Sequence, residues 1–380
     1  VIGDLDTSER LLQAVLEHAK TPFEKVDAYS LLMLQFIFGM DYRRSLEMGR
    51  KALGLLGVSF PAIETDEDLG ARIGAEMGEI GALLAERDLS AMLEWPETDD
   101  ATAIAISKLA EFIGPPCFVL GLLEHWTLSV LLGTHTGLAA GVTLNSPYAF
   151  TQYGMILSAV GMRQEGYAFG EMGCRLAGKW GVASVDQVVK SNFLRAEYLV
   201  SWVRPYAESD EVAQLAFKAA TDNGNFMFRG WVDLHRNMAW FSQGRPLVSW
   251  RKNLGKVLGR NRQHMQCVEA LNGVDALAAY LLQDVPFDEA DETQGDAYLQ
   301  HSRDIESSYN IRQYLIFRAR THCFFGEWQQ AADTMRESRQ HVAGQGLMDL
   351  EVAQDLYHAL AVVKLAQRET DEQLRSALIE

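Results

Sequence analysis

A short junction motif recurs along the chain and constrains its fold more than any other feature. At each copy a helix-forming stretch ends, often at Gly, and an aromatic residue, Pro or Arg opens the next stretch. A small residue follows three positions later, and the clearest copy, Phe-Gly-Glu-Trp-Gln-Gln-Ala, occupies residues 325–331. The small residue allows two antiparallel helices to approach closely, while the large residue fills the end of the hairpin. The motif therefore predicts helix hairpins.

The copies are spaced almost evenly, which indicates a repeat. Their small residues are Gly166, Ser209, Ser249 and Ala331, separated by 43, 40 and 82 residues. One hairpin cannot bury its apolar face alone, so evenly spaced hairpins stack on their neighbours. We expect an all-α fold of antiparallel helix hairpins, with a period of about 41 residues, stacked in a right-handed tetratricopeptide-like superhelix. Gly166, Ser249 and Ala331 should be buried at helix crossings, and a non-repeating helical bundle is the alternative.

Composition supports helices and disfavours several kinds of partner. Only 9 prolines occur, and alternating runs of β-branched residues are nearly absent, so strands have little support. The net charge of −17 repels phosphate backbones, which disfavours nucleic acid as a partner. Four cysteines without a C-x-x-C pair are typical of reduced thiols in a cytoplasmic protein.

A membrane span is not expected either. The most apolar run, residues 117–133, is interrupted by Glu124 and His125 and is short for a bilayer. No secretory signal opens the chain, which starts at Val1 without Met, as an excised fragment would. We therefore expect one cytoplasmic α-solenoid over residues 1–380, belonging to a larger multidomain protein.

Apolar periodicity and helix-stop signals place the helices. Gly57, Gly181, Gly224 and Gly326 stand where helices should end. The predicted helices are 7–20, 23–38, 41–56, 65–86, 99–113, 117–133, 147–160, 163–180, 185–203, 208–222, 225–242, 246–259, 262–283, 293–306, 309–325, 327–343, 347–367 and 370–378.

Two stretches carry a resemblance to a known kind of protein. One is residues 40–57, which begins Met-Asp-Tyr-Arg-Arg-Ser-Leu-Glu, and the other is residues 148–157, followed by Gly161 and residues 167–171. Together they resemble the helical repeat region of large bacterial signal-transduction ATPases. Proteins of that family carry a P-loop ATPase before the repeats, and many add Ser/Thr kinase or GAF and histidine-kinase modules. The resemblance runs loosely from about residue 20 to 345 and implies a regulatory segment between such modules.

Motifs for catalysis are weak in this chain. Residues 173–180, Gly-Cys-Arg-Leu-Ala-Gly-Lys-Trp, match a P-loop except that Trp180 replaces the Ser or Thr that holds magnesium. The stretch also lies in a helical pattern, where backbone N–H groups are already hydrogen-bonded. No H-E-x-x-H motif, clustered Cys/His spacing or Gly-x-Ser-x-Gly elbow occurs. We therefore expect no catalytic, cofactor-binding or metal-binding residues.

One aromatic face could line a binding groove. In the predicted helix 225–242, Trp231 and His235 share a face with Phe228 and Met238, and Arg236 and Trp240 form a neighbouring face. Aromatic rings with His and Arg suit a concave peptide or small-molecule site. Packing between hairpins is the alternative interpretation.

A local reversal of charge follows that helix. Eight basic residues and one acid, Asp233, lie between Arg229 and Arg262. Lys252, Lys256 and Arg260 are four apart and form one helical stripe, with Trp250, Leu254 and Val257 on the other side. The stripe predicts a docking patch for an acidic partner, and a solvated helix face is the alternative.

These observations favour a non-catalytic scaffold that mediates contacts with a protein, a peptide or other domains of the same polypeptide. A small molecule in the concave face is possible, and neither nucleic acid nor membrane is expected. A helical sensor arm of a transcription activator and an all-α enzyme with a buried site are the alternatives.

Overall fold

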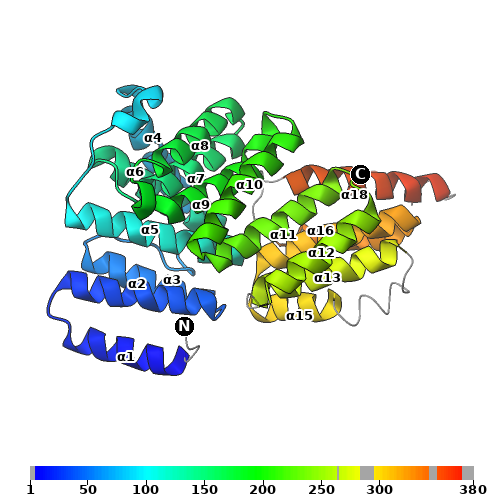
Figure 1. Cartoon of the computed structure of the whole chain (residues 1–380), viewed down its shortest axis with the longest axis horizontal. Helices are drawn as coiled ribbons and strands as arrows, with labels where there is room; N and C mark the ends of the chain where they lie inside the picture. Colours follow the sequence, from blue (N-terminus) through cyan, green and yellow to red (C-terminus); the bar gives the residue numbers. More distant parts are fainter. Residues whose placement is uncertain (1–4, 263–264, 283–294, 342–348, 370–380) are drawn as a thin grey trace. The chain divides into compact units, whose positions relative to one another are not determined.

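The computed structural model describes residues 5–262, 265–282, 295–341 and 349–369 of the chain (Figure 1). Helix makes up 81% of the structure, and the described residues contain 17 α-helices and no strand, which confirms the all-α prediction. An isolated β-bridge joins Glu97 to Val142. The contacts among its residues divide the molecule into two compact units, Val1–Arg195 and Ala196–Glu380.

Unit 1 is built from consecutive helices that pack as neighbours, namely α1 with α2, α2 with α3, α5 with α6 and α7 with α8. The elements are α1 (Leu5–His18), α2 (Pro22–Phe38), α3 (Tyr42–Leu55), α4 (Leu69–Ala85), the 3₁₀ turn η1 (Leu89–Glu94), α5 (Ala101–Leu120), α6 (Leu123–Ala139), α7 (Ser146–Ala159), α8 (Arg163–Ala177), η2 (Gly181–Ser184) and most of α9 (Val185–Tyr198).

Unit 2 follows the same rule, with α10 against α11, α12 against α13, and α16 against α17. Its elements are η3 (Val200–Trp202), α10 (Tyr206–Asn223), α11 (Phe226–Ser242), α12 (Leu247–Arg260), α13 (Met265–Leu281), α15 (Asp296–Asp304), α16 (Ser308–Phe325), α17 (Trp328–Ser338) and α18 (Asp349–Arg368). The predicted helix 370–378 lies outside the described residues.

Glycines end several helices as predicted. Gly224 and Gly326 directly follow α10 and α16 with φ angles of 71° and 73°, in the left-handed region that other residues rarely adopt. Gly57 and Gly181 also have positive φ angles, of 78° and 59°. These breaks turn the chain between packed helices.

The predicted break at Pro115 and Pro116 is wrong. Instead of ending near residue 113, α5 continues through both prolines to Leu120 and ends at Gly121. Proline inside a helix removes a backbone hydrogen bond and costs about 3 kcal/mol in isolation. Ile113 and Cys117, on either side of the prolines, are fully buried, so packing outweighs the local penalty. By length and composition α5 could also cross a membrane, but half of its apolar window is buried against the rest of the protein.

Helices α7 and α8 cross at close range. A Cβ atom at Gly166 would lie under 3.0 Å from the carbonyl oxygen of Gly154, and one at Gly173 would meet the Thr151 side chain. Gly166 is buried, and so is Ala331 in α17, as the junction motif predicts. The small residues at these two junctions are therefore buried where α8 and α17 pack against neighbouring helices.

At Ser249 the predicted register is wrong, because this residue is exposed. The buried residues of α12 are Trp250, Leu254 and Val257, spaced four and three apart on one face. Ser249 is displaced from Trp250 by about 100° around the helix axis and faces away from that side. Trp250, only 1% exposed, occupies the space between hairpins that a small residue was expected to leave.

We predict that Gly166→Ala lowers the free energy of unfolding by about 1–3 kcal/mol, because backbone on α7 blocks the added methyl group. Gly74→Ala in α4 is the matched control, since a Cβ there meets nothing within 4 Å. The control should stabilise by about 0.5–1 kcal/mol through helix propensity. Urea unfolding followed by circular dichroism measures both, and equal effects would contradict the close crossing.

Candidate functional site

The seven residues predicted to form a partner surface lie on two helices of unit 2. Trp231, His235, Arg236 and Trp240 belong to α11, and Lys252, Lys256 and Arg260 belong to α12. The structure divides them among four environments: hydrogen bonds to Asp210 of α10, an ion pair with Asp233 of α11, the interior of the unit, and the exposed side of α12.

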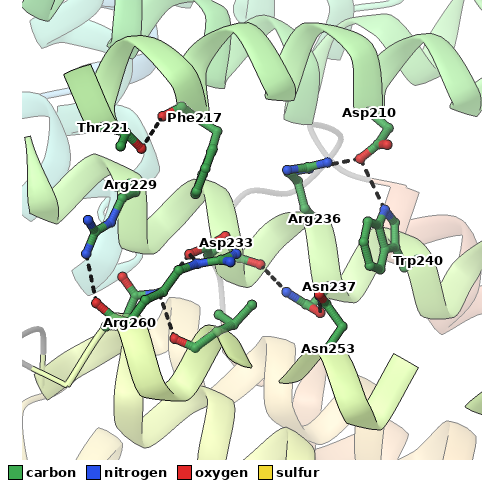
Figure 2. Close-up of polar contacts among 12 residues, drawn as sticks. Asp210, Phe217, Thr221, Arg229, Asp233, Arg236, Asn237, Trp240, Asn253 and Arg260 are labelled. Atoms are coloured by element: carbon green, nitrogen blue, oxygen red, sulfur yellow. Dashed lines mark hydrogen bonds and ion pairs between the residues drawn. The ribbon is translucent and has the colours of Figure 1, made fainter. Parts of the chain in front are cut away.

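Asp210 of α10 holds the Arg236 and Trp240 side chains (Figure 2). Its Oδ1 accepts hydrogen bonds from Arg236 Nε at 2.9 Å and from Trp240 Nε1 at 3.1 Å. Arg245 lies 3.8 Å from the other oxygen and 4.3 Å above the Trp240 ring. Burial by itself raises the pKa of Asp210, but the hydrogen bond and charge of Arg236 outweigh it and lower the pKa below its ordinary value. The arrangement fixes α10 to α11.

Asp233 binds the last residue of the predicted stripe. Its carboxylate is 1% exposed and accepts from Arg260 through both Nε, at 2.6 Å, and Nη2. Asn261 Nδ2 donates to the same carboxylate at 2.8 Å, and Arg229 donates to the Arg260 carbonyl oxygen (Figure 2). Although the Arg260 side chain is 37% exposed, it neutralises a buried charge. Arg260 is thus exposed, as expected, but its guanidinium is already engaged by a carboxylate of the same chain.

His235 belongs to a buried polar array. Its Nδ1 is 2.8 Å from Glu197 Oε1, and its Nε2 is 3.0 Å from the Tyr309 hydroxyl, which also accepts from Gln313. Burial raises the pKa of Tyr309 well above its ordinary value, so the phenol stays protonated. His235 and Tyr309 are 4% and 5% exposed. This face of α11 packs in the interior, which agrees with the alternative interpretation of core packing.

Lys252 and Lys256 are also exposed. Neither forms an ion pair with the described residues, whereas the neighbouring Arg251 lies 3.3 Å from Asp275. Val248, one turn before Lys252, is 70% exposed and continues the same face. The outer side of α12 therefore presents two adjacent cations and an apolar side chain.

The carboxylates that organise this region were missed in the sequence. Asp210 is 26 residues before Arg236, and Glu197 is still further from its partner His235. No local spacing within one helix connects residues on different helices. Asp233 was visible as the single acid in a basic stretch, and that isolation was the one available signal.

The P-loop-like stretch is helical only in its first part, because α8 ends at Ala177 and residues 178–180 form a turn instead of continuing the predicted helix 163–180. Residues up to Ala177 complete α8, and Lys179 then pairs with Glu97 at 2.8 Å. Trp180 Nε1 donates to the same carboxylate. Burial also raises the pKa of the four cysteine thiols, to about 12 at Cys174, so they are not thiolates at neutral pH.

Three potential metal ligands meet in unit 1, where the sequence motifs indicated none. Glu76 and Glu79 of α4 and His135 of α6 have ligand atoms within 4.8 Å of one another. His135 is 59 residues from Glu76, so only the fold brings them together.

Comparison with known proteins leaves the family open: no family model matches the sequence, and no curated protein is detectably related to it. The site and the fold thus describe an all-α protein of paired helices with a small basic surface on α12.

Proposed function

We propose that this chain is a non-catalytic scaffold that docks an acidic protein surface, in a cytoplasmic bacterial signalling protein, through the outer face of α12. The observation that carries the proposal is the exposed pair Lys252 and Lys256 beside Val248, in a chain whose net charge is −17. The resemblance to the repeat region of signal-transduction ATPases favours another domain of the same polypeptide as the partner.

The chemistry of this face suits docking. Four cations of the surrounding stretch, Arg236, Arg245, Arg251 and Arg260, are paired internally with Asp210, Asp275 or Asp233. The two lysines keep their charge for an external partner, and cationic side chains accelerate encounter with an acidic surface. The exposed Val248 adds apolar area at the same place, and buried apolar contacts supply most of the holding energy of an interface.

The Lys252→Glu, Lys256→Glu double variant tests the proposal. Affinity for the acidic partner domain should fall by about tenfold or more at low salt, mainly through slower association. Raising ionic strength should weaken the wild type and leave the variant nearly unchanged, because exposed charges are screened within about 8 Å at physiological salt.

A Lys218→Glu, Lys364→Glu variant carries the same change in net charge on α10 and α18 and is the matched control. It should bind as the wild type does. Separately purified domains encoded by the same gene serve as partners in the titration, with association rates measured at two salt concentrations. Equal affinities of wild type, double variant and control would make this face of α12 an ordinary solvated surface.

A further inference from the structure

We infer that unit 1 binds a divalent transition-metal ion between α4 and α6, through Glu76, Glu79 and His135. This inference is independent of the docking surface proposed for unit 2. Its basis is the geometry of the three side chains, the weak attachment of α4, and the chemistry of the donor set.

The donor atoms are spaced as metal ligands require. His135 Nδ1 lies 3.3 Å from Glu76 Oε2 and 3.8 Å from Glu79 Oε2. Ligands about 2.1 Å from one tetrahedral zinc ion are about 3.4 Å apart, so the first separation already fits. The Glu79 side chain is 65% exposed and has room to rotate toward the other two.

Glu76 interrupts the packing face of its own helix. The residues of α4 that are shielded from solvent follow a helical stripe that includes Ile73, Met77 and Ile80, and Glu76 lies within it. A carboxylate at a partly buried position loses hydration and needs a compensating charge. His135 supplies one positive charge only when it is protonated, whereas a dication would neutralise both glutamates.

A metal bridge would also explain how α4 stays in place. Only Leu69 and Ile80 of this helix are buried, and α6 is its main neighbour. Four glycines, at 70, 74, 78 and 81, each lower helix stability by about 0.5–1 kcal/mol relative to Ala. Ligands three residues apart on α4 and a third on α6 would hold the helix in shape and fasten it to its neighbour.

The donor set selects the class of ion. Imidazole nitrogen favours Zn²⁺ and its first-row neighbours, while Mg²⁺ and Ca²⁺ prefer oxygen ligands alone. Three protein ligands leave one or more coordination positions for water, and the donors are partly exposed. We therefore expect a single exchangeable ion rather than a closed structural centre.

The experiment is a calorimetric titration of the full chain with Zn²⁺ alone, repeated with Mg²⁺. One Zn²⁺ should bind per chain, and Mg²⁺ should bind much more weakly or not at all. His135→Gln and Glu79→Gln should each weaken Zn²⁺ binding by about tenfold or more, because each removes a ligand. His18→Gln, at an exposed histidine of α1, should leave the affinity unchanged.

A second measurement separates a metal clip from a simple ion pair. Zn²⁺ should slow hydrogen exchange of the α4 amides in the wild type and have no such effect in Glu79→Gln, whose exposed position makes it a safe variant for folding. Binding that survives in both ligand variants, equal binding of Mg²⁺, or absence of Zn²⁺ binding would each overturn the proposal and leave His135 as an ion-pair partner of the two glutamates.

Discussion

Replacing Glu111 with Ala is expected to lower the free energy of unfolding of unit 1 by about 3–5 kcal/mol, the effect of removing one partner from a buried ion pair. The Glu111 side chain, on α5, is 5% exposed and accepts from Lys190 Nζ at 2.5 Å. It also accepts from the amides of Asn145 and Gln187, at 2.7 and 2.8 Å. One carboxylate thus joins α5 to the start of α7 and to α9.

The charge on Lys190 is the main reason why Glu111→Ala should lower the stability so much. Burial alone lowers the pKa of Lys190, but the charges of Glu111 and Asp186 outweigh burial and raise the pKa above its ordinary value. Removal of Glu111 leaves this buried amine with Asp186 as its carboxylate partner, so either its charge is poorly compensated or it must give up its proton, and both are costly. The buried amide of Gln187 and the partly buried amide of Asn145 lose their acceptor at the same time, and each loss adds to the penalty.

Urea unfolding followed by circular dichroism measures this effect, and hydrogen exchange of the α5 and α9 amides assigns it to unit 1. Glu47→Ala is the matched control, because Glu47 pairs with Lys51 on the surface of α3. Exposed pairs contribute less than about 1 kcal/mol. A Glu111→Ala effect as small as that of the control would mean that water reaches the carboxylate and replaces its partners.

Arg260→Glu is expected to destabilise unit 2 by about 3–5 kcal/mol, because it removes the cation that compensates a buried carboxylate and adds a like charge beside it. Asp233 is 1% exposed and would keep Asn261 as its remaining side-chain donor. The Arg260 guanidinium also lies 5.0 Å from the Phe217 ring, a contact that Glu cannot replace.

Lys256→Glu, one turn earlier on α12, makes the same reversal of charge at an exposed position without an ion pair in the described structure. Its free energy of unfolding should change by less than about 0.5 kcal/mol, as is typical of surface substitutions. The urea midpoints of Arg260→Glu and Lys256→Glu show whether the charge at residue 260 stabilises the fold more than the charge at residue 256. Coincident midpoints would show that Asp233 does not depend on the charge of Arg260 and would return Arg260 to the docking stripe with Lys252 and Lys256.

Helix positions were largely predictable because they depend on signals carried by neighbouring residues. The predicted helix 225–242 became Phe226–Ser242, and 309–325 became Ser308–Phe325. Apolar periodicity marks the face of a helix, and a glycine that tolerates positive φ marks its end, as at Gly326. Both signals act over a few residues and need no knowledge of the rest of the fold.

The candidate surface was only partly predictable for the same reason. Helical spacing correctly placed Lys252 and Lys256 opposite Trp250 and Leu254, because one helix determines which residues share a face. It could not show that Arg260 meets Asp233 on α11, since that partner comes from the preceding helix. Of the three cations in the predicted stripe, Lys252 and Lys256 therefore remain for a partner, while Arg260 is paired with Asp233.

The sequence by itself determined that this chain is all helix, where most of its helices lie and which faces are apolar, because backbone hydrogen bonding and amphipathic periodicity are local. Only the tertiary structure decided the remaining features. It carried α5 through Pro116, turned Ser249 outward beside a buried Trp250, and brought Glu76 to His135. The physical reason is that packing density and the pairing of buried charges depend on residues far apart in the chain.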